Sequence, residues 1–133
     1  MLDTNILVSA LLSSKEDSAT VQVVSRLFSG DFCPLLSRDI LTEYRDVLRR
    51  PKFGFSETII EAMLAGIEDR AQVIEPTPSG ELLPDMKDLP FYEVVLEKKD
   101  APAYLVTGNM KHFPEKPFIV TAREFLELLD RTD

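Results

Sequence analysis

Short apolar runs alternate along the chain with longer stretches whose apolar residues recur at helical spacing, and this alternation constrains the fold most. The apolar runs predict strands at Leu2 and at residues 32–36, 72–74, 104–106 and 118–120. Between them, apolar residues three and four positions apart predict amphipathic helices. Because strands that alternate with helices favour a parallel sheet covered on both faces, we expect an α/β fold.

Local signals mark where several of these helices begin and end. Ser37 and Ser56 are suited to cap the helices that follow them, and residues 121–124 form a capping box before the last helix. Gly30 is a predicted C-cap, and Pro51 is expected to stop the helix that begins after Ser37. No linker is long enough to separate two folding units, so we predict a single domain over residues 1–133.

The start of the chain, its apolar runs and its single cysteine indicate the cellular compartment of the protein. No apolar run approaches the roughly 18 residues that a membrane-spanning helix needs, so we expect no membrane contact. The start lacks a basic leader region, although the stretch before Asp3 is so short for a strand that we expect a few residues to precede Met1. Cys33 is the single cysteine and cannot form an internal disulfide. Both features favour the cytoplasm, and Cys33 is expected in the core.

The formal charge of −8 counts against a broad electrostatic nucleic-acid binder, because Lys and Arg provide affinity for phosphates. It is compatible with an enzyme that contacts a few nucleotides, since clustered carboxylates would need cations before a phosphate could approach. The simpler interpretation, that negative charge keeps a small protein in solution, remains open at this point.

Oxygen-bearing side chains follow two of the predicted strands. Asp3, with Thr4 and Asn5 after it, ends the first strand, and Thr107 and Asn109 follow the strand at 104–106. Ligands of open α/β sheets gather beyond the carboxyl ends of the strands, so these groups are expected in one crevice. Two further acids can reach it, namely Asp88 at a predicted helix start and Glu43 at the edge of an apolar helix face.

Three carboxylates and an amide oxygen are ligands suited to Mg²⁺ or Mn²⁺. With one histidine and one cysteine, the chain has too few soft ligands for zinc and lacks the second histidine of a two-histidine ribonuclease. The sequence contains neither a glycine-rich phosphate loop nor a nucleophile elbow. Attack of metal-activated water on a phosphodiester remains as the favoured chemistry. We expect His112, beside Phe113 and Pro114, to be structural.

Four sequence blocks resemble the PIN-domain family in their order and spacing. They are LDTNILVSAL at residues 2–11, LSRDILTEY at 36–44, DMKDLPF at 85–91 and YLVTGN at 104–109. Together they span most of the chain. The resemblance is greatest to the group of bacterial and archaeal PIN domains described as toxin components of toxin–antitoxin pairs.

The resemblance implies a three-layer α/β/α fold with a central parallel sheet of about five strands. It implies that Asp3, Glu43 and Asp88 hold the metal, with Asn109 as a fourth catalytic residue and Thr4, Asn5 and Thr107 in support. Mg²⁺- or Mn²⁺-dependent cleavage of single-stranded RNA follows from it, as do a cognate antitoxin protein and a homodimer.

The chain departs from the family pattern in one place, because many PIN domains have an aspartate where this chain has Asn109. The departure puts a complete two-metal site in doubt. The third acidic position is also open among Asp85, Asp88 and Glu93, of which Asp88 is favoured at the predicted helix start.

The leading hypothesis is therefore a toxin endoribonuclease. The alternative is a catalytically weak or inactive PIN-like module that binds RNA or a protein partner. A small phosphatase or receiver domain would share the α/β layout, but no lysine follows a strand in a matching motif.

Overall fold

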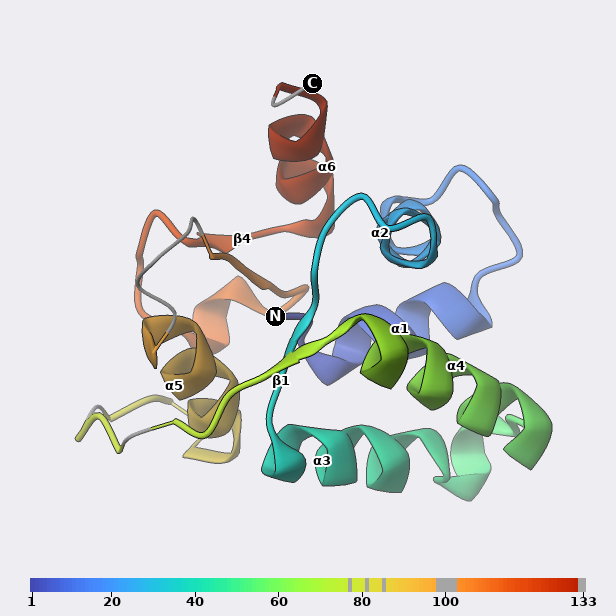
Figure 1. Cartoon of the computed structure of the whole chain (residues 1–133), viewed down its shortest axis with the longest axis horizontal. Coiled ribbons are helices and arrows are strands. Elements are labelled where there is room, and N and C mark those ends of the chain that lie inside the picture. The colour runs from blue at the N-terminus through green and yellow to red at the C-terminus, as the bar shows by residue number, and fades with distance from the viewer. Residues whose placement is uncertain (77, 81, 85, 98–102, 132–133) are drawn as a thin grey trace.

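The computed structural model describes residues 1–76, 78–80, 82–84, 86–97 and 103–131. Figure 1 shows helices packed around short strands. The helices are α1 (Thr4–Leu12), α2 (Ala19–Phe28), α3 (Arg38–Leu48), α4 (Glu57–Arg70), α5 (Leu89–Glu97) and α6 (Ala122–Arg131). Short 3-10 helices connect them at η1 (Pro51–Phe53), η2 (Met86–Asp88) and η3 (Met110–His112). The strands are β1 (Leu35–Leu36), β2 (Gln72–Val73), β3 (Leu105–Val106) and β4 (Ile119–Val120).

All the strand pairings in the described ranges are parallel, as the alternating pattern predicted. β1 pairs with β2, and β3 pairs with β4. Leu2 adds a parallel bridge to Val106, and the amide of Asp3 donates to the carbonyl of Val106 at 2.9 Å. The α/β class and the parallel direction are thus confirmed, and the first segment lies beside β3.

The central sheet of about five strands is not confirmed, because the described strands form two separate two-stranded sheets. Strand length accounts for part of the difference. Helices begin at Thr4, Arg38 and Ala122, within two residues of Leu2, Leu36 and Val120. Little extended backbone remains for a continuous ladder.

The predicted caps at the helix starts are confirmed, whereas the C-cap of α2 is Ser29, one residue before the expected Gly30. Ser37 and Ser56 accept hydrogen bonds from the amides of Ile40 and Ile59, each at 3.2 Å. In the capping box, the amide of Glu124 donates to the Thr121 hydroxyl at 3.1 Å, and the amide of Thr121 donates to the Glu124 carboxylate at 2.9 Å. These bonds satisfy amides that a helix start leaves without intrahelical partners.

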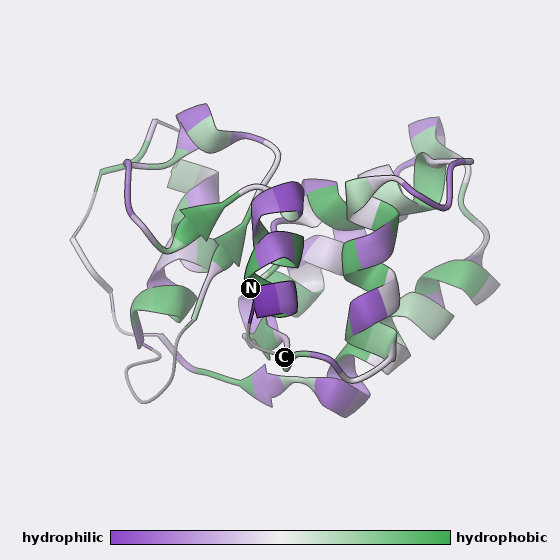
Figure 2. Ribbon diagram, turned by 90° about the horizontal axis from the view of Figure 1, so that it is seen from above, coloured by the Kyte–Doolittle hydropathy of each residue, from purple (hydrophilic) through white to green (hydrophobic). Residues whose placement is uncertain are grey.

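The core lies where the helices cover the strands. α1 packs against α2, and α2 packs against α6. Figure 2 shows hydrophobic strands, in green, inside the molecule, a partly hydrophilic strand at its edge, and several helices divided between hydrophobic and hydrophilic faces. The partly hydrophilic composition matches β2, which is exposed. The most deeply buried side chains include Leu7, Leu27, Ile40, Leu64 and Leu105.

The expectation of a buried Cys33 is wrong, because this side chain is exposed. The predicted strand at 32–36 begins only at Leu35, so Cys33 lies in the connection between α2 and β1. Its thiol donates to the carbonyl of Arg70 at 3.4 Å.

Among the residues with described positions, no helix combines the length and apolar character that crossing a membrane requires.

Candidate functional site

A pocket of about 240 Å³ opens where α1, α3 and α5 meet the 3-10 helices η1, η2 and η3. Its lining contains polar residues from several parts of the sequence together with apolar ones. They are Asp3, Thr4, Asn5, Val8, Glu43, Val47, Phe53, Asp88, Phe91, Asn109 and His112. The structure therefore brings Asp3, Glu43, Asp88 and Asn109 to one pocket, together with the expected supporting residues Thr4 and Asn5.

Asp3 is the most buried carboxylate of the pocket, at 6% exposure. Burial raises its pKa, because a low-polarity environment disfavours the charged form. The hydrogen bond from the Thr107 hydroxyl is the largest opposing effect, and His112 opposes the increase electrostatically. A cation in the pocket would likewise favour the charged form of Asp3.

Thr107, directly after β3, orients the Asp3 side chain although it does not itself line the pocket. Its hydroxyl donates to Asp3 Oδ2 at 2.6 Å and accepts from the amide of Asn109 at 3.0 Å. The amide of Gly108 also donates to Asn5 Oδ1 at 3.3 Å. These bonds connect the start of α1 to the turn after β3, so Thr107 acts beside the pocket rather than within its lining.

Glu43 lies on the exposed side of α3, next to the buried Tyr44. The Tyr44 hydroxyl donates to the carbonyl of Leu2, and burial raises the pKa of that hydroxyl, which keeps it protonated as a donor. The contact holds α3 against the segment that carries Asp3. Glu43 thereby stands at the solvent side of the same pocket.

Asp88 is the candidate for the third acidic position that lines the pocket. Its Oδ2 lies 3.2 Å from His112 Nδ1, and its side chain is 18% exposed. Glu93 instead accepts a hydrogen bond from the amide of Ser79 and is not part of the lining. Asp85 lies outside the described residues.

His112 is a pocket residue for which sequence reasoning favoured a structural role. It follows Asn109 by three positions, and residues at that spacing share a side of a 3-10 helix. That spacing was the available signal. Its contact with Asp88 requires η2 and η3 to lie close together, and no short sequence motif predicts that proximity.

The pocket fits a hard divalent cation only in part. No three Asp, Glu, His or Cys side chains in the described parts of the chain lie close enough together to hold one metal ion. The three carboxylates expected around one cation therefore share the pocket without forming a closed cage. Mg²⁺ is commonly held by one or two carboxylates and several waters, and Asp3 and Asp88 both line this pocket.

Thr4 provides a second observation in favour of a polar ligand. It is 6% exposed, lines the pocket, and its hydroxyl oxygen has no hydrogen-bond partner among the residues that are described. A buried hydroxyl without a partner is costly, so a water or ligand oxygen here would be stabilising.

Comparison with known proteins identifies the family. A family model described as PIN domain matches residues 1–111, which include every pocket residue except His112. No curated protein and no solved structure matches the chain. PIN domains are generally nucleases, so the match indicates a nuclease-type module. Because the match covers most of the 133 residues, the chain belongs to the PIN-domain family.

Proposed function

We propose that this chain is a divalent-metal-dependent endoribonuclease that cleaves single-stranded RNA. The observation that carries the proposal is the pocket shared by Asp3, Glu43 and Asp88 in a member of a nuclease family. Apart from His112, the polar groups of the lining are carboxylates, amides and a hydroxyl, and such oxygen ligands favour Mg²⁺ or Mn²⁺ over softer metals.

Asp3 and Asp88 would hold the metal directly, and Glu43 would act from the solvent side, through water or after a change of side-chain rotamer. A bound Mg²⁺ or Mn²⁺ would supply Lewis-acid stabilisation of the phosphate and activation of the attacking water. The Thr107 hydroxyl fixes the Asp3 carboxylate in one orientation. Asn109 offers an amide oxygen or an N–H donor toward a phosphate or water.

The test is cleavage of a mixture of single-stranded RNAs in Mn²⁺, with and without chelator. We expect internal cleavage that chelator abolishes and that Asp3→Asn reduces by at least about a hundredfold, since losing even an outer-shell partner of a metal costs about tenfold to a hundredfold. Cleavage that persists in chelator, or that Asp3→Asn leaves intact, would contradict the proposal.

A PIN-like module that binds RNA or a protein without cutting is the second candidate. Three observations favour it, namely the amide at Asn109, the net charge of −8 and the lack of a three-ligand group among the described residues. It predicts no cleavage product under any metal condition in the same assay.

A role as the toxin of a toxin–antitoxin pair extends the proposal, with a cognate antitoxin, a homodimer and a cytoplasmic location. Induced expression in bacteria should then arrest growth, and the Asp3→Asn variant should not. Light scattering at high concentration should give the mass of a dimer. Normal growth during expression of an active nuclease would separate the toxin role from the cleavage activity.

A further inference from the structure

The same pocket has an apolar part that metal binding does not explain. Val8, Val47, Phe53 and Phe91 line it beside the carboxylates. A cation and a phosphate need only the polar groups. A nucleotide combines a phosphate with an aromatic base. The polar groups can contact the phosphate, and the apolar lining can contact the base.

Phe53 is the aromatic residue best placed to meet a base. It comes from η1, the short connection between α3 and α4, and its half-buried ring stacks on Phe55 with centroids 5.6 Å apart and an interplanar angle of 14°. Gly54, at φ +69°, ends the turn in a left-handed conformation that glycine adopts readily. Lys52 places its ammonium nitrogen 5.1 Å from the Phe53 ring centroid.

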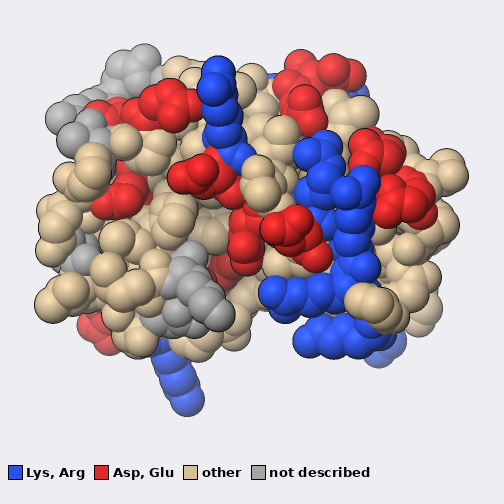
Figure 3. Space-filling model, turned by 90° about the horizontal axis from the view of Figure 1, so that it is seen from below, with Lys and Arg blue, Asp and Glu red and all other residues tan. Residues whose placement is uncertain are grey.

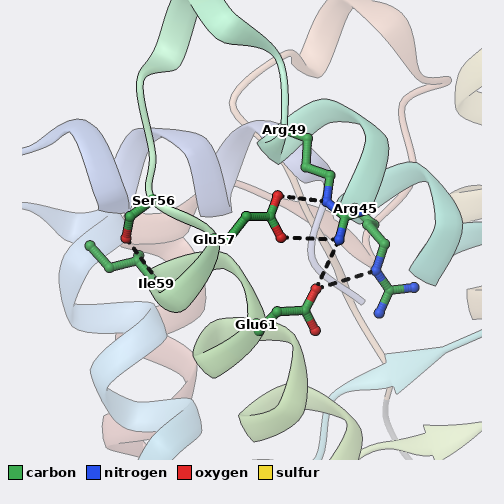
Figure 4. A network of polar contacts seen from close by, with 6 residues as sticks. All are labelled: Arg45, Arg49, Ser56, Glu57, Ile59 and Glu61. Carbon is green, nitrogen blue, oxygen red and sulfur yellow. Dashed lines mark hydrogen bonds and ion pairs between the residues drawn. The ribbon is translucent and has the colours of Figure 1, made fainter.

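An ion-pair network holds the two helices that flank this turn, as Figure 4 shows. Arg49, the residue after α3, contacts Glu57 at 2.9 Å and Glu61 at 3.2 Å, both on α4. Arg45 lies 3.7 Å from Glu61. Individual exposed ion pairs contribute little stability, but a shared network restrains the ends of the connection. The stacked rings are therefore presented by a constrained turn.

The same region concentrates positive charge on a protein whose net charge is −8. Figure 3 shows a band of Lys and Arg side chains on the lower face, with acidic side chains beside it. Arg45 and Arg49 are neutralised by the network. Lys52 forms no ion pair with any residue whose side chain is described, so its charge remains available beside the pocket.

We propose that Phe53 and Lys52 form a nucleotide-positioning site for single-stranded RNA, in which Phe53 stacks on a base and Lys52 binds a neighbouring phosphate. The inference rests on the proposed function and adds two positioning residues to it. Stacking on a protein ring requires a base that is free of a duplex, so this site would select single strands. Lys52 would leave its position over the ring when the base enters, and its ammonium would then contact the backbone.

The test is binding of fluorescein-labelled oligoadenylate RNA, followed by anisotropy in Ca²⁺, with RNA integrity checked on a gel. Phe53→Leu keeps an apolar side chain against Phe55 but removes the aromatic face. We expect at least about fivefold weaker binding, in keeping with the loss of one stacked base. Phe28→Leu is the matched control, because Phe28 also lies beside a cation, Arg70 at 5.2 Å, and is partly exposed, but does not line the pocket.

An abasic strand of the same length separates stacking from misfolding. It offers phosphates but no bases, so Phe53→Leu should bind it as the wild type does. Equal losses for the abasic and the oligoadenylate strands would overturn the stacking role. Lys52→Gln should reduce the salt dependence of binding by about 0.7 in logarithmic slope, as expected for one phosphate contact. Lys116→Gln should not, because Lys116 is an exposed lysine in the connection before β4 and is not adjacent in sequence to any pocket residue.

The outcomes for this site and for the nuclease are distinguishable. If Phe53→Leu binds RNA as the wild type does while Asp3→Asn abolishes cleavage, the positioning site is wrong and the nuclease stands. If the wild type never cleaves but Phe53→Leu selectively weakens base-containing strands, the positioning site stands and the nuclease is wrong. A wild type that binds no single-stranded RNA in Ca²⁺ overturns the positioning site.

Discussion

The hydroxyl of Thr107 donates to the buried carboxylate of Asp3 across 2.6 Å, and the two residues are 104 positions apart in the sequence. This bond joins the end of β3 to the start of α1. It fixes the orientation of the least exposed acid in the pocket, and it is the largest effect that opposes the raised pKa of Asp3.

Replacing Thr107 with valine should destabilise the protein. The change keeps the side-chain shape but leaves a buried carboxylate without its hydroxyl donor, which costs on the order of 1–3 kcal/mol. Urea unfolding at neutral pH without metal measures the change in the free energy of unfolding. Thr42→Val, at an exposed position of α3, is the control and should cost much less. Equal effects of the two variants would show that the bond to Asp3 is not stabilising.

Asp3→Asn should raise the stability of the metal-free protein at neutral pH. Because burial raises the folded-state pKa of Asp3, the folded protein binds this proton more tightly than the unfolded chain. The contribution of Asp3 is therefore most favourable at acidic pH and is lost as the pH rises through its folded-state pKa. The variant's advantage in urea unfolding should shrink as the pH falls toward 3.8, the ordinary value. An advantage that is constant or grows on acidification would contradict this account.

Capping at Ser37 should matter for the site as well as for stability. Ser37→Ala and Ser56→Ala each remove a hydrogen bond at a helix start, with an expected cost of about 1 kcal/mol. Only the first affects α3, the helix that carries Glu43. We expect similar losses of unfolding free energy from both variants, but reduced RNA cleavage from Ser37→Ala alone. Equal cleavage by the two variants at a temperature where both are folded would argue against a role for Glu43.

The helix caps and the buried helix faces were predictable, because the sequence patterns that indicate them lie within a few residues. The Ser37 and Ser56 caps depend on the next helical turn, and the burial of Ile40 or Leu64 follows from helical periodicity. Strand length was overestimated, because the ladder at 32–36 depends on partners far along the chain and begins only at Leu35.

The acidic residues of the site were predictable from the sequence, but the residues that complete the pocket around them were not. Predicted strand ends and helix edges placed Asp3, Glu43, Asp88 and Asn109 in one crevice, and the family resemblance added their roles. The structure places all four around one pocket. Two contacts depend on how the short helices η1, η2 and η3 pack against the rest of the domain. They are the contact of His112 with Asp88 and the position of Phe53 in the pocket lining. No periodicity or local motif predicts them.

Asn109→Asp should tighten divalent-metal binding. A carboxylate would add a negative charge near the cation, and the attraction at about 4 Å is on the order of a few kcal/mol at an effective dielectric of 20 before desolvation is subtracted. Titration calorimetry with Mn²⁺ on both proteins measures the change, which should be greatest at a second, weaker site. Unchanged affinity would indicate that Asn109 serves the turn before η3 instead.

The central claim is that the acids of this pocket, and not acidity in general, support metal-dependent cleavage. Glu93 provides the matched comparison, because it lies five residues after Asp88 on α5 but does not line the pocket. The most direct measurement is the single-turnover rate of single-stranded RNA cleavage in Mn²⁺ by wild type, Asp88→Asn and Glu93→Gln. The account predicts a loss of at least about a hundredfold for Asp88→Asn and a rate near that of the wild type for Glu93→Gln. Equal rates for Asp88→Asn and wild type, in a protein that cleaves RNA, would contradict it.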